Sequence, residues 1–366
     1  MSIIAKAGKT VRKLIKKASA YNIKRIQKNK IKELRRAAVI NGVILTKEQE
    51  SQIQSLYSQN LGCEISTDWH RYYQGVSGTF AADYVPELHY ALYECAVNSS
   101  KYINAYTDKI LQYQILSSIP EIKTAELYLF NRSGVWYDAN FAALELKEAI
   151  ETIRSKQVVF YKPINDTNSG IGCGIFGADK KSDDEIKEFL SAHNNYMIQS
   201  IVKNADDVAQ FHPASCNTFR IMTYKHEGKV YDAPALLRMG VGHQNVDNAH
   251  AGGIFVGVGR DGSLKSVAHS EYGEDYIEHP TTKVAFGGKK IKKVPELIEA
   301  LKKAHNHFQH MGILSWDAVI DTEGNFVVIE VNSLGQSPWL VQMANGTGLF
   351  EENTPKVLQE MKNLFK

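Results

Sequence analysis

The sequence predicts an α/β or α+β fold with mixed sheets. Stretches with the apolar spacing of strands and of helices alternate along most of the chain, rather than separating into two halves. The chain has 366 residues, of which 43% are hydrophobic and 23% are charged, so it can bury a large core of ordinary globular composition. No internal repeat and no low-complexity segment interrupts this pattern.

The composition also argues against several classes of protein. Four cysteines, Cys63, Cys95, Cys173 and Cys216, have neither a C-x-x-C spacing nor a disulfide-like one, which disfavours a zinc site and favours a reducing compartment. No apolar run approaches the roughly 20 residues of a membrane span, and the amino terminus is too polar for a secretory signal. We therefore expect a cytoplasmic protein.

Positive charge is concentrated at the amino terminus. Residues 1–36 hold thirteen Lys and Arg and one acid, Glu33, so they carry about +12, whereas the remainder carries about −9. Helical spacing of apolar residues from Val11 to Ala18 predicts a basic helical arm over 1–40. Such an arm can lie on an anionic membrane surface, dock on an acidic partner or pack on its own protein. Aromatic residues are nearly absent from it, which disfavours nucleic acid as a partner.

The elements after the arm follow from apolar spacing and from residues that end helices. Leu88, Ala91 and Leu92 recur three and four residues apart, which predicts that 86–118 is mostly helical, and Pro120 marks an end. Up to residue 202, the same reasoning predicts helices at 47–60, 86–118, 143–154 and 183–192 and strands at 125–130, 158–163 and 197–202. From residue 217 it predicts strands at 218–224, 230–239, 253–258, 264–268, 312–320 and 326–332 and a helix at 295–309.

The last two strands form a hairpin that carries three oxygen-bearing side chains. A turn rich in Asp, Gly and Asn at 321–325 joins them. Asp317 lies on the first strand, and Glu330 and Asn332 point to one face of the second because strand side chains alternate with a period of 2. Carboxylate and amide oxygens are hard ligands that suit Mg²⁺ completed by water and nucleotide phosphate. An ordinary hairpin with a wet polar face would show the same pattern.

A glycine-rich loop follows the strand that contains Lys162. Gly170, Gly172 and Gly174 let backbone N–H groups approach phosphate oxygens closely, and the lysine can pair with a phosphate as a point charge. The loop is not a Walker A motif, and its G-x-G-x-G spacing before a strand is not a Rossmann fingerprint. A plain flexible turn remains the alternative.

These motifs together resemble the ATP-grasp superfamily. The intervals of 13 and 2 residues from Asp317 to Glu330 to Asn332 match its metal-ligand pattern, and Lys162 with its loop resembles the lid over the triphosphate. Asp108-Lys109, which opens a helix leading to Ile119-Pro120, resembles the Asp-Lys pair that supplies the other lysine contacting ATP. Further elements resemble the glutamate-ligase branch, namely Arg220, Arg238 and the run Asn248 to Gly253. Over about residues 80–350 the chain is most similar to the sugar-transfer-associated ATP-grasp family.

The resemblance implies an α+β ATP-grasp fold, in which two α+β subdomains clamp ATP, preceded by a helical amino-terminal region. It divides the chain into a basic helical arm (1–40), a helical pre-ATP-grasp region (41–125), a small subdomain with the lid (126–202) and a large subdomain with the Mg²⁺ site (203–366).

The resemblance also implies roles for individual residues. The ATP-binding residues are Lys109 and Lys162 at the phosphates, Ser169, Gly170 and Gly172 in the lid, Gln199 at the hinge near the adenine, and Asp206 or Asp207 at the ribose. Asp317, Glu330 and Asn332 hold Mg²⁺. The catalytic residues are Arg220 and Arg238, which neutralise an acylphosphate, and Asn248. Gly252-Gly253 and residues 333–339 line the acceptor pocket.

The activity that the resemblance implies is ATP- and Mg²⁺-dependent ligation of a carboxylate to an amine. The branch suggests biosynthesis of a cell-surface polysaccharide or glycolipid, with a sugar uronic acid as carboxylate and an amino acid as amine. Residues 1–36 would then contact the anionic inner face of the membrane. Whether the chain forms an oligomer is left open by the sequence. The alternatives are a peptide-forming ligase of natural-product biosynthesis and a non-catalytic nucleotide-binding interaction protein.

Overall fold

The computed structural model describes Arg25 and residues 42–165, 170–242, 252–271 and 273–365. The chain divides into two compact units, one made of residues 1–99 and 334–366 and the other of residues 100–333. The predicted basic arm, except Arg25, and the predicted site residues Ser169 and Asn248 lie outside the described residues. The division of the chain into segments 1–40, 41–125, 126–202 and 203–366 stays a prediction. Among the described helices, none has the length and hydropathy needed to cross a membrane.

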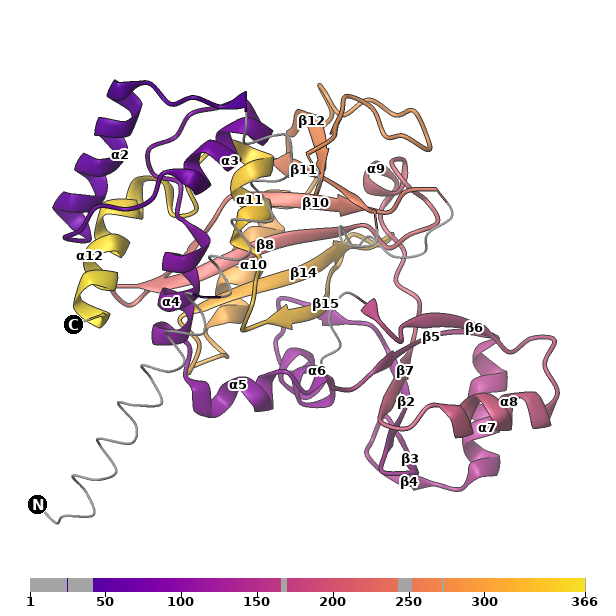
Figure 1. Ribbon diagram of the computed structural model, residues 1–366. Helices are drawn as coiled ribbons and strands as arrows, with labels where there is room; N and C mark the ends of the chain where they lie inside the picture. Colours follow the sequence, from indigo (N-terminus) through magenta and orange to yellow (C-terminus); the bar gives the residue numbers. More distant parts are fainter. Residues whose placement is uncertain (1–24, 26–41, 166–169, 243–251, 272, 366) are drawn as a thin grey trace, which may run out of the picture. The chain divides into compact units, whose positions relative to one another are not determined.

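The first unit is helical and joins both ends of the described chain. It contains α2 (Lys47–Asn60), α3 (Asp68–Ser77), α4 (Glu87–Val97), α11 (Pro338–Asn345), the short η4 (Glu351–Asn353) and α12 (Thr354–Leu364). The indigo α2 lies against the yellow α12, and α3 lies against α11 (Figure 1). Aromatic side chains fill the space between these helices, among them the fully buried Tyr57, Tyr73 and Tyr84.

The second unit begins with α5 (Ser100–Tyr106) and α6 (Lys109–Ser117) and continues into a six-stranded antiparallel sheet. The strand order is β4 (Ala143–Leu144), β3 (Val135–Asp138), β2 (Leu127–Arg132), β7 (Tyr196–Gln199), β5 (Val158–Pro163) and β6 (Gly174–Gly177). The helices α7 (Leu146–Lys156) and α8 (Asp183–Ala192) cover one face of this sheet (Figure 1). Ile153 and Ile186 on these helices and Leu129 and Ile198 on the strands belong to one buried cluster.

A nine-stranded sheet forms the rest of the second unit. Its order is β1 (Lys123–Thr124), β15 (Phe326–Asn332), β14 (Ile313–Ile320), β8 (Thr218–His226), β10 (Ala235–Met239), β11 (Ile254–Val258), β12 (Leu264–Ser270) and β13 (Asp275–Tyr276), with β9 (Lys229–Asp232) beside β8. Of the described strand pairs in this sheet, β1 with β15 is the parallel one. The short α9 (Asp206–Ala209) precedes β8, and α10 (Val294–His305) precedes β14.

The two faces of the nine-stranded sheet differ in chemistry. Alternate residues such as Phe219, Leu237 and Trp316 belong to the hydrophobic core that Leu297 and Leu301 of α10 complete. The residues between them, which point to the opposite face, include charged side chains, among them Arg220, Arg238 and Asp317. Because strand side chains alternate with a period of 2, the core on one face fixes which residues are presented on the other.

Several predicted elements are confirmed, and others are corrected. Helices 47–60 and 183–192 and strand 158–163 have the predicted bounds. The stretch predicted to be mostly helical over 86–118 contains three helices. The last of them begins after Asp108, as predicted, where Asp108 accepts from the N–H groups of Ile110 and Leu111. The strand predicted at 230–239 is divided into β9 and β10. Helix α11 was missed because its residues Pro338–Ala344 are all buried, so its sequence has no amphipathic period.

Two turns of the large sheet test how backbone conformation and packing add. Gly262 has a φ of +88°, and a Cβ there would collide with the carbonyl of Ile291; Gly228 has a φ of +75° and open space around it. We expect Gly228→Ala to lower the free energy of unfolding by about 1–2 kcal/mol through left-handed strain alone. Gly262→Ala should cost about 2–5 kcal/mol, because overpacking adds to that strain. Urea denaturation of both variants measures the difference, and equal costs would contradict this account of the Gly262 turn.

Candidate functional site

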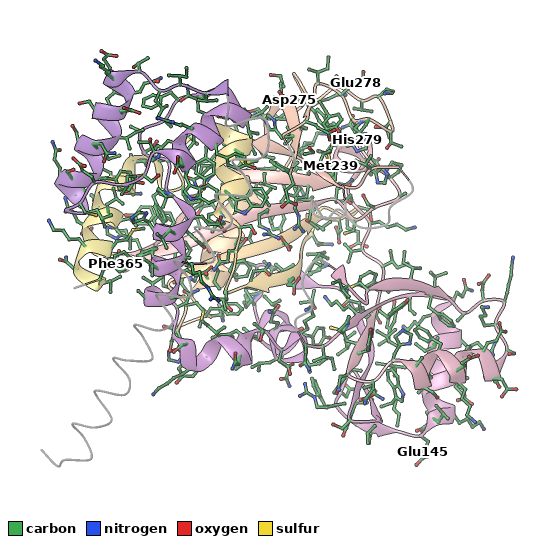
Figure 2. The ribbon with its side chains drawn as sticks, viewed as in Figure 1. Glu145, Met239, Asp275, Glu278, His279 and Phe365 are labelled. Atoms are coloured by element: carbon green, nitrogen blue, oxygen red, sulfur yellow. The ribbon has the colours of Figure 1, made fainter. Side chains whose placement is uncertain are left out.

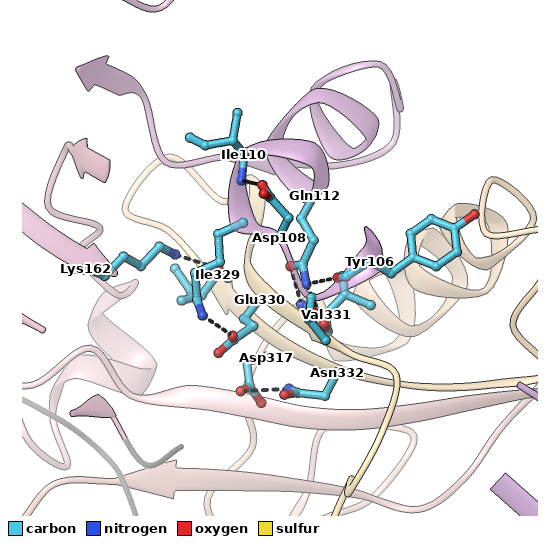
Figure 3. A network of polar contacts seen from close by, with 12 residues as sticks. Tyr106, Asp108, Ile110, Gln112, Lys162, Asp317, Ile329, Glu330, Val331 and Asn332 are labelled. Atoms are coloured by element: carbon cyan, nitrogen blue, oxygen red, sulfur yellow. Dashed lines mark hydrogen bonds and ion pairs between the residues drawn. The ribbon is translucent and has the colours of Figure 1, made fainter. Parts of the chain in front are cut away.

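Strand register gathers charged side chains across the middle of the large sheet. Glu330 on β15 lies opposite Asp317 on β14, and Asp317 lies opposite Arg220 on β8. Asn332 lies opposite Ser315, two residues from Asp317. Directly opposed residues share a sheet face. The three predicted metal ligands are therefore close together on one surface (Figure 3).

Asp317 is a buried carboxylate held by two arginines. Nε of Arg220 donates to Oδ1 at 2.6 Å, and Nη2 of Arg220 donates to Oδ2 at 3.1 Å. Nη2 of Arg238 lies 3.2 Å from Oδ2. Burial favours the neutral acid, but the charges of Arg220 and Arg238 outweigh it and hold the pKa of Asp317 below its usual value. Asp317 is therefore ionised near neutral pH.

Two lysines approach the same region from the small sheet and from α6. Nζ of Lys109 lies 3.0 Å from Oε1 of Glu330. Nζ of Lys162 donates to the carbonyl of Ile329 at 3.1 Å (Figure 3). The backbone N–H of Lys109 donates to the carbonyl of Ile164, directly after β5, which ties the two lysine-bearing elements together. Burial lowers the pKa of Lys162, and Lys109 adds to this effect while Glu330 opposes it.

Gln112 fixes the backbone between two of the predicted metal ligands. Its side chain donates to the carbonyl of Val331 at 2.8 Å and accepts from the N–H of the same residue at 3.1 Å. Val331 stands between Glu330 and Asn332, so this pair of hydrogen bonds fixes the position of β15 relative to α6 (Figure 3). Gln112 was not predicted from the sequence. The available signal was a polar residue one helical turn after Lys109, on the face of α6 that carries the lysine.

A small cavity lies where the lysines converge. Lys109, Lys162, Gln112, Gln199 and Thr124 contribute polar groups to it, and its apolar wall includes Met197 and Val328. The cavity thus combines two ammonium groups and two amides with an apolar wall, which are groups suited to contact phosphates and a base. Three residues predicted to contact ATP are therefore brought together, although their roles stay predictions.

The other described residues predicted to bind ATP do not line this cavity. Gly170 and Gly172 have positive φ, and a Cβ on Gly172 would meet Oη of Tyr196 at 2.7 Å, so that position requires glycine. Asp206 is exposed in the first turn of α9 and is not among the residues that line the cavity. Oδ2 of Asp207 accepts from the N–H of Lys292 at 2.8 Å. The choice between these two acids as a ribose ligand stays open.

The donor set fits Mg²⁺ when phosphate and water complete it. Within the described ranges, no group of three or more His, Cys, Asp or Glu side chains could hold a metal ion. Asp317 and Glu330 supply two carboxylates, and Asn332 adds an amide whose Nδ2 lies 3.5 Å from Oδ2 of Asp317. A half-turn of that amide directs its oxygen to the same side. Few protein ligands are normal for Mg²⁺, which keeps several waters and binds nucleotide phosphates.

The charge balance around Asp317 predicts an order of stabilities. Asp317→Leu leaves Arg220 and Arg238 facing each other without their shared carboxylate, so it should lower the free energy of unfolding by about 3–5 kcal/mol at neutral pH. Arg220→Met leaves the Asp317–Arg238 pair in place and should cost less. Urea denaturation measures both values, and a larger cost for Arg220→Met would contradict this order.

The loss of unfolding free energy in Asp317→Leu depends on pH. The folded-state pKa of Asp317 is lowered, so its contribution is present above the unfolded pKa of about 3.9 and is lost as pH falls through the folded value. The cost of Asp317→Leu should therefore shrink in acid. A cost that does not change with pH would mean that Asp317 stabilises the fold by packing rather than by charge.

Comparison with solved structures finds ligases and synthases. N5-carboxyaminoimidazole synthase from Aspergillus clavatus matches with 14% identity over 67% of this chain and 50% of that chain, with a TM-score of 0.38. D-alanyl-alanine synthetase A from Vibrio cholerae matches with 12% identity over 70% and 65%, with a TM-score of 0.41. L-amino acid ligase from Bacillus licheniformis matches with 15% identity over 70% and 48%, with a TM-score of 0.40. The matched part thus spans about half the length of two of these proteins and 65% of the third.

Sequence comparison gives a more decisive result. No curated protein sequence matches the chain. A family model described as sugar-transfer associated ATP-grasp matches residues 90–359, which is most of the chain. This match confirms the predicted α+β ATP-grasp fold, and it confirms ATP and Mg²⁺, the cofactors of ATP-grasp proteins, as the expected cofactors. The chain belongs to the sugar-transfer associated ATP-grasp family.

Proposed function

We propose that the chain is a ligase that uses ATP and Mg²⁺ to join a carboxylate to an amine through an acylphosphate. One observation carries the proposal. Lys109 lies 3.0 Å from Glu330, and Asp317 lies within 3.2 Å of both Arg220 and Arg238, on one continuous face of the large sheet. Two carboxylates for a metal therefore stand between cations suited to the nucleotide and cations suited to the substrate.

The lysines and the amide at the small cavity would hold the nucleotide. Lys109 and Lys162 supply two ammonium groups for its phosphates, and Gln199 supplies an amide for the adenine or ribose. When bound, Mg²⁺ supplies positive charge at the β- and γ-phosphate oxygens. Asp317, Glu330 and Asn332 would hold it. Binding of the metal and phosphates would thus replace the contacts that Lys109 and Arg220 now make with Glu330 and Asp317.

The arginines would serve the transferred phosphoryl group and the acylphosphate. Phosphoryl transfer needs positioning and neutralisation of charge more than covalent chemistry by the protein. Arg220 and Arg238 are almost buried, with side-chain exposures of 10% and 12%, so their charges act in a medium that screens them weakly. The guanidinium fork matches the oxygen geometry of a phosphate. This arrangement supports transfer of the γ-phosphoryl group, with release of ADP.

The finer parts of the proposal concern the substrates and their place in the cell. The sugar-transfer association in the description of the family supports a cell-surface polysaccharide or glycolipid as the setting, with a sugar uronic acid and an amino acid as substrates. The basic residues 1–36 suit an anionic membrane surface where such lipid-linked sugars would be built. A peptide-forming ligase is the competing enzyme. The retained set of Asp317, Glu330 and Asn332 argues against a non-catalytic nucleotide-binding protein.

The proposal predicts the products and the residue on which they depend. Purified protein should release ADP and phosphate, not AMP and pyrophosphate, in the presence of ATP, Mg²⁺ and a pool of uronic and amino acids. Hydroxylamine should trap the activated carboxylate as a hydroxamate. Glu330→Gln should lose most of both activities, because it removes one of two metal carboxylates.

Glu323→Gln in the turn of the same hairpin is the matched control. The Glu323 side chain is 78% exposed and outside the site, so this variant should behave as the wild type. AMP as the stoichiometric product would refute the acylphosphate route. Unchanged activity of Glu330→Gln would refute the metal assignment.

A further inference from the structure

A histidine–carboxylate pair lies on the same sheet face as the arginines. Nδ1 of His269 on β12 lies 2.8 Å from Oδ1 of Asp275 on β13. Because His269 has no metal-ligand spacing, the sequence alone favours a surface or core role for it. The imidazole is almost buried, with a side-chain exposure of 6%, whereas Asp275 is 62% exposed at the edge of the sheet (Figure 2). Neither residue belongs to the nucleotide and metal site described above.

Strand register connects this pair to the site. Arg238 on β10 lies opposite Phe255 on β11, Phe255 lies opposite His269, and His269 lies opposite Asp275. Opposed residues share a face, so all four point to the side of the sheet that carries Asp317. Neighbouring strands are about 4.8 Å apart, which puts His269 about 10 Å from Arg238 across the sheet.

The hydrogen bond to Asp275 sets the chemistry of the imidazole. A carboxylate beside Nδ1 holds the proton on that nitrogen and leaves Nε2 as an acceptor. The same arrangement orients the histidine base of hydrolases. The side chain of Phe255, between His269 and Arg238 in the register, is fully buried, and its ring centroid lies 6.1 Å from that of His269. The pair is therefore built to accept a proton at Nε2.

The proposed reaction needs a proton acceptor for the amine. An amino group is an ammonium ion near neutral pH and must lose a proton before it can attack. Around Asp317 and Glu330, the described side chains of Lys109, Arg220 and Arg238 are cations. The carboxylates of Asp317 and Glu330 would themselves be engaged by the metal. On this part of the face, His269 supplies an imidazole nitrogen.

We propose that His269, oriented by Asp275, is the general base that activates the amine; this inference rests on the function proposed above. Nε2 takes one proton from the ammonium ion and becomes imidazolium. The free amine attacks the acylphosphate carbonyl, a C–N bond forms and the bond from the carbonyl carbon to the phosphate oxygen breaks. The second proton leaves with the phosphate as HPO₄²⁻, the third stays on the amide, and the imidazolium returns its proton to solvent.

Hydroxylamine separates activation of the amine by His269 from the earlier formation of the acylphosphate. It is uncharged at neutral pH, so it attacks the acylphosphate without needing a base. Full-length wild type and His269→Asn are compared with ATP, Mg²⁺ and each uronic or amino acid that supports ADP release, once with hydroxylamine and once with pooled amino acids. His269→Asn should keep hydroxamate formation within about twofold of wild type and lose about 10²–10⁴-fold in amide formation. Asp275→Asn should change amide formation in the same direction by a smaller factor.

His226→Asn is the matched control. His226 lies on the same face of the sheet at the end of β8, has a side-chain exposure of 7% and stands 4.0 Å from Glu227. It is six residues from Arg220, or about 20 Å along the strand, and should affect neither product. Equal loss of hydroxamate and amide in His269→Asn, or no loss of either, would overturn the proposal and leave the pair as a tie between β12 and β13. Absence of ADP release and of hydroxamate in wild type would instead overturn the proposed function, and this inference with it.

Discussion

The arrangement of the site depends on one constraint, the pairing of buried opposite charges across adjacent strands. Glu330, Asp317 and Arg220 stand in one row over β15, β14 and β8. A buried carboxylate without a partner would cost several kcal/mol of folding free energy. The bidentate contact from Arg220 and the further contact from Arg238 remove that cost and fix the positions of three side chains. The site is thus ordered by the charges that it would use in catalysis.

The same pairing bears on how the site would bind Mg²⁺ and ATP. Lys109 and the arginines neutralise Glu330 and Asp317, so each carboxylate already has a cation in place. Under the proposed function, Asp317 and Glu330 would hold Mg²⁺, while Lys109 and the arginines would pair with phosphate, so no group would lose its opposite charge. Such an exchange would keep the cost of binding low, because the cations would go from carboxylate to phosphate rather than out of water. Gln112 holds the backbone of β15 beside α6 through its two bonds to Val331.

Local patterns predicted the hairpin well and the tertiary partners poorly. The period of 2 in β15 was sufficient to place Glu330 and Asn332 on one face, and the turn at 321–325 brought Asp317 to them. Arg220 is 97 residues from Asp317 in the sequence, and their contact depends on the register of β8 against β14, which no local spacing encodes. The resemblance supplied Arg220 as a phosphate ligand, but its bond to Asp317 came from the structure. His269 was passed over for the same reason, since its neighbours Phe255 and Asp275 become apparent only when the strand order is known.

The most direct test of the central claim is a crystal structure of the full chain with Mn²⁺ and a non-hydrolysable ATP analogue. The account predicts anomalous density for the metal at about 2.1–2.2 Å from carboxylate oxygens of both Asp317 and Glu330. It also predicts that Nζ of Lys109 and Nζ of Lys162 contact phosphate oxygens instead of Glu330 and the carbonyl of Ile329. A metal and nucleotide bound elsewhere, with Asp317 still paired to Arg220 and Arg238, would contradict it.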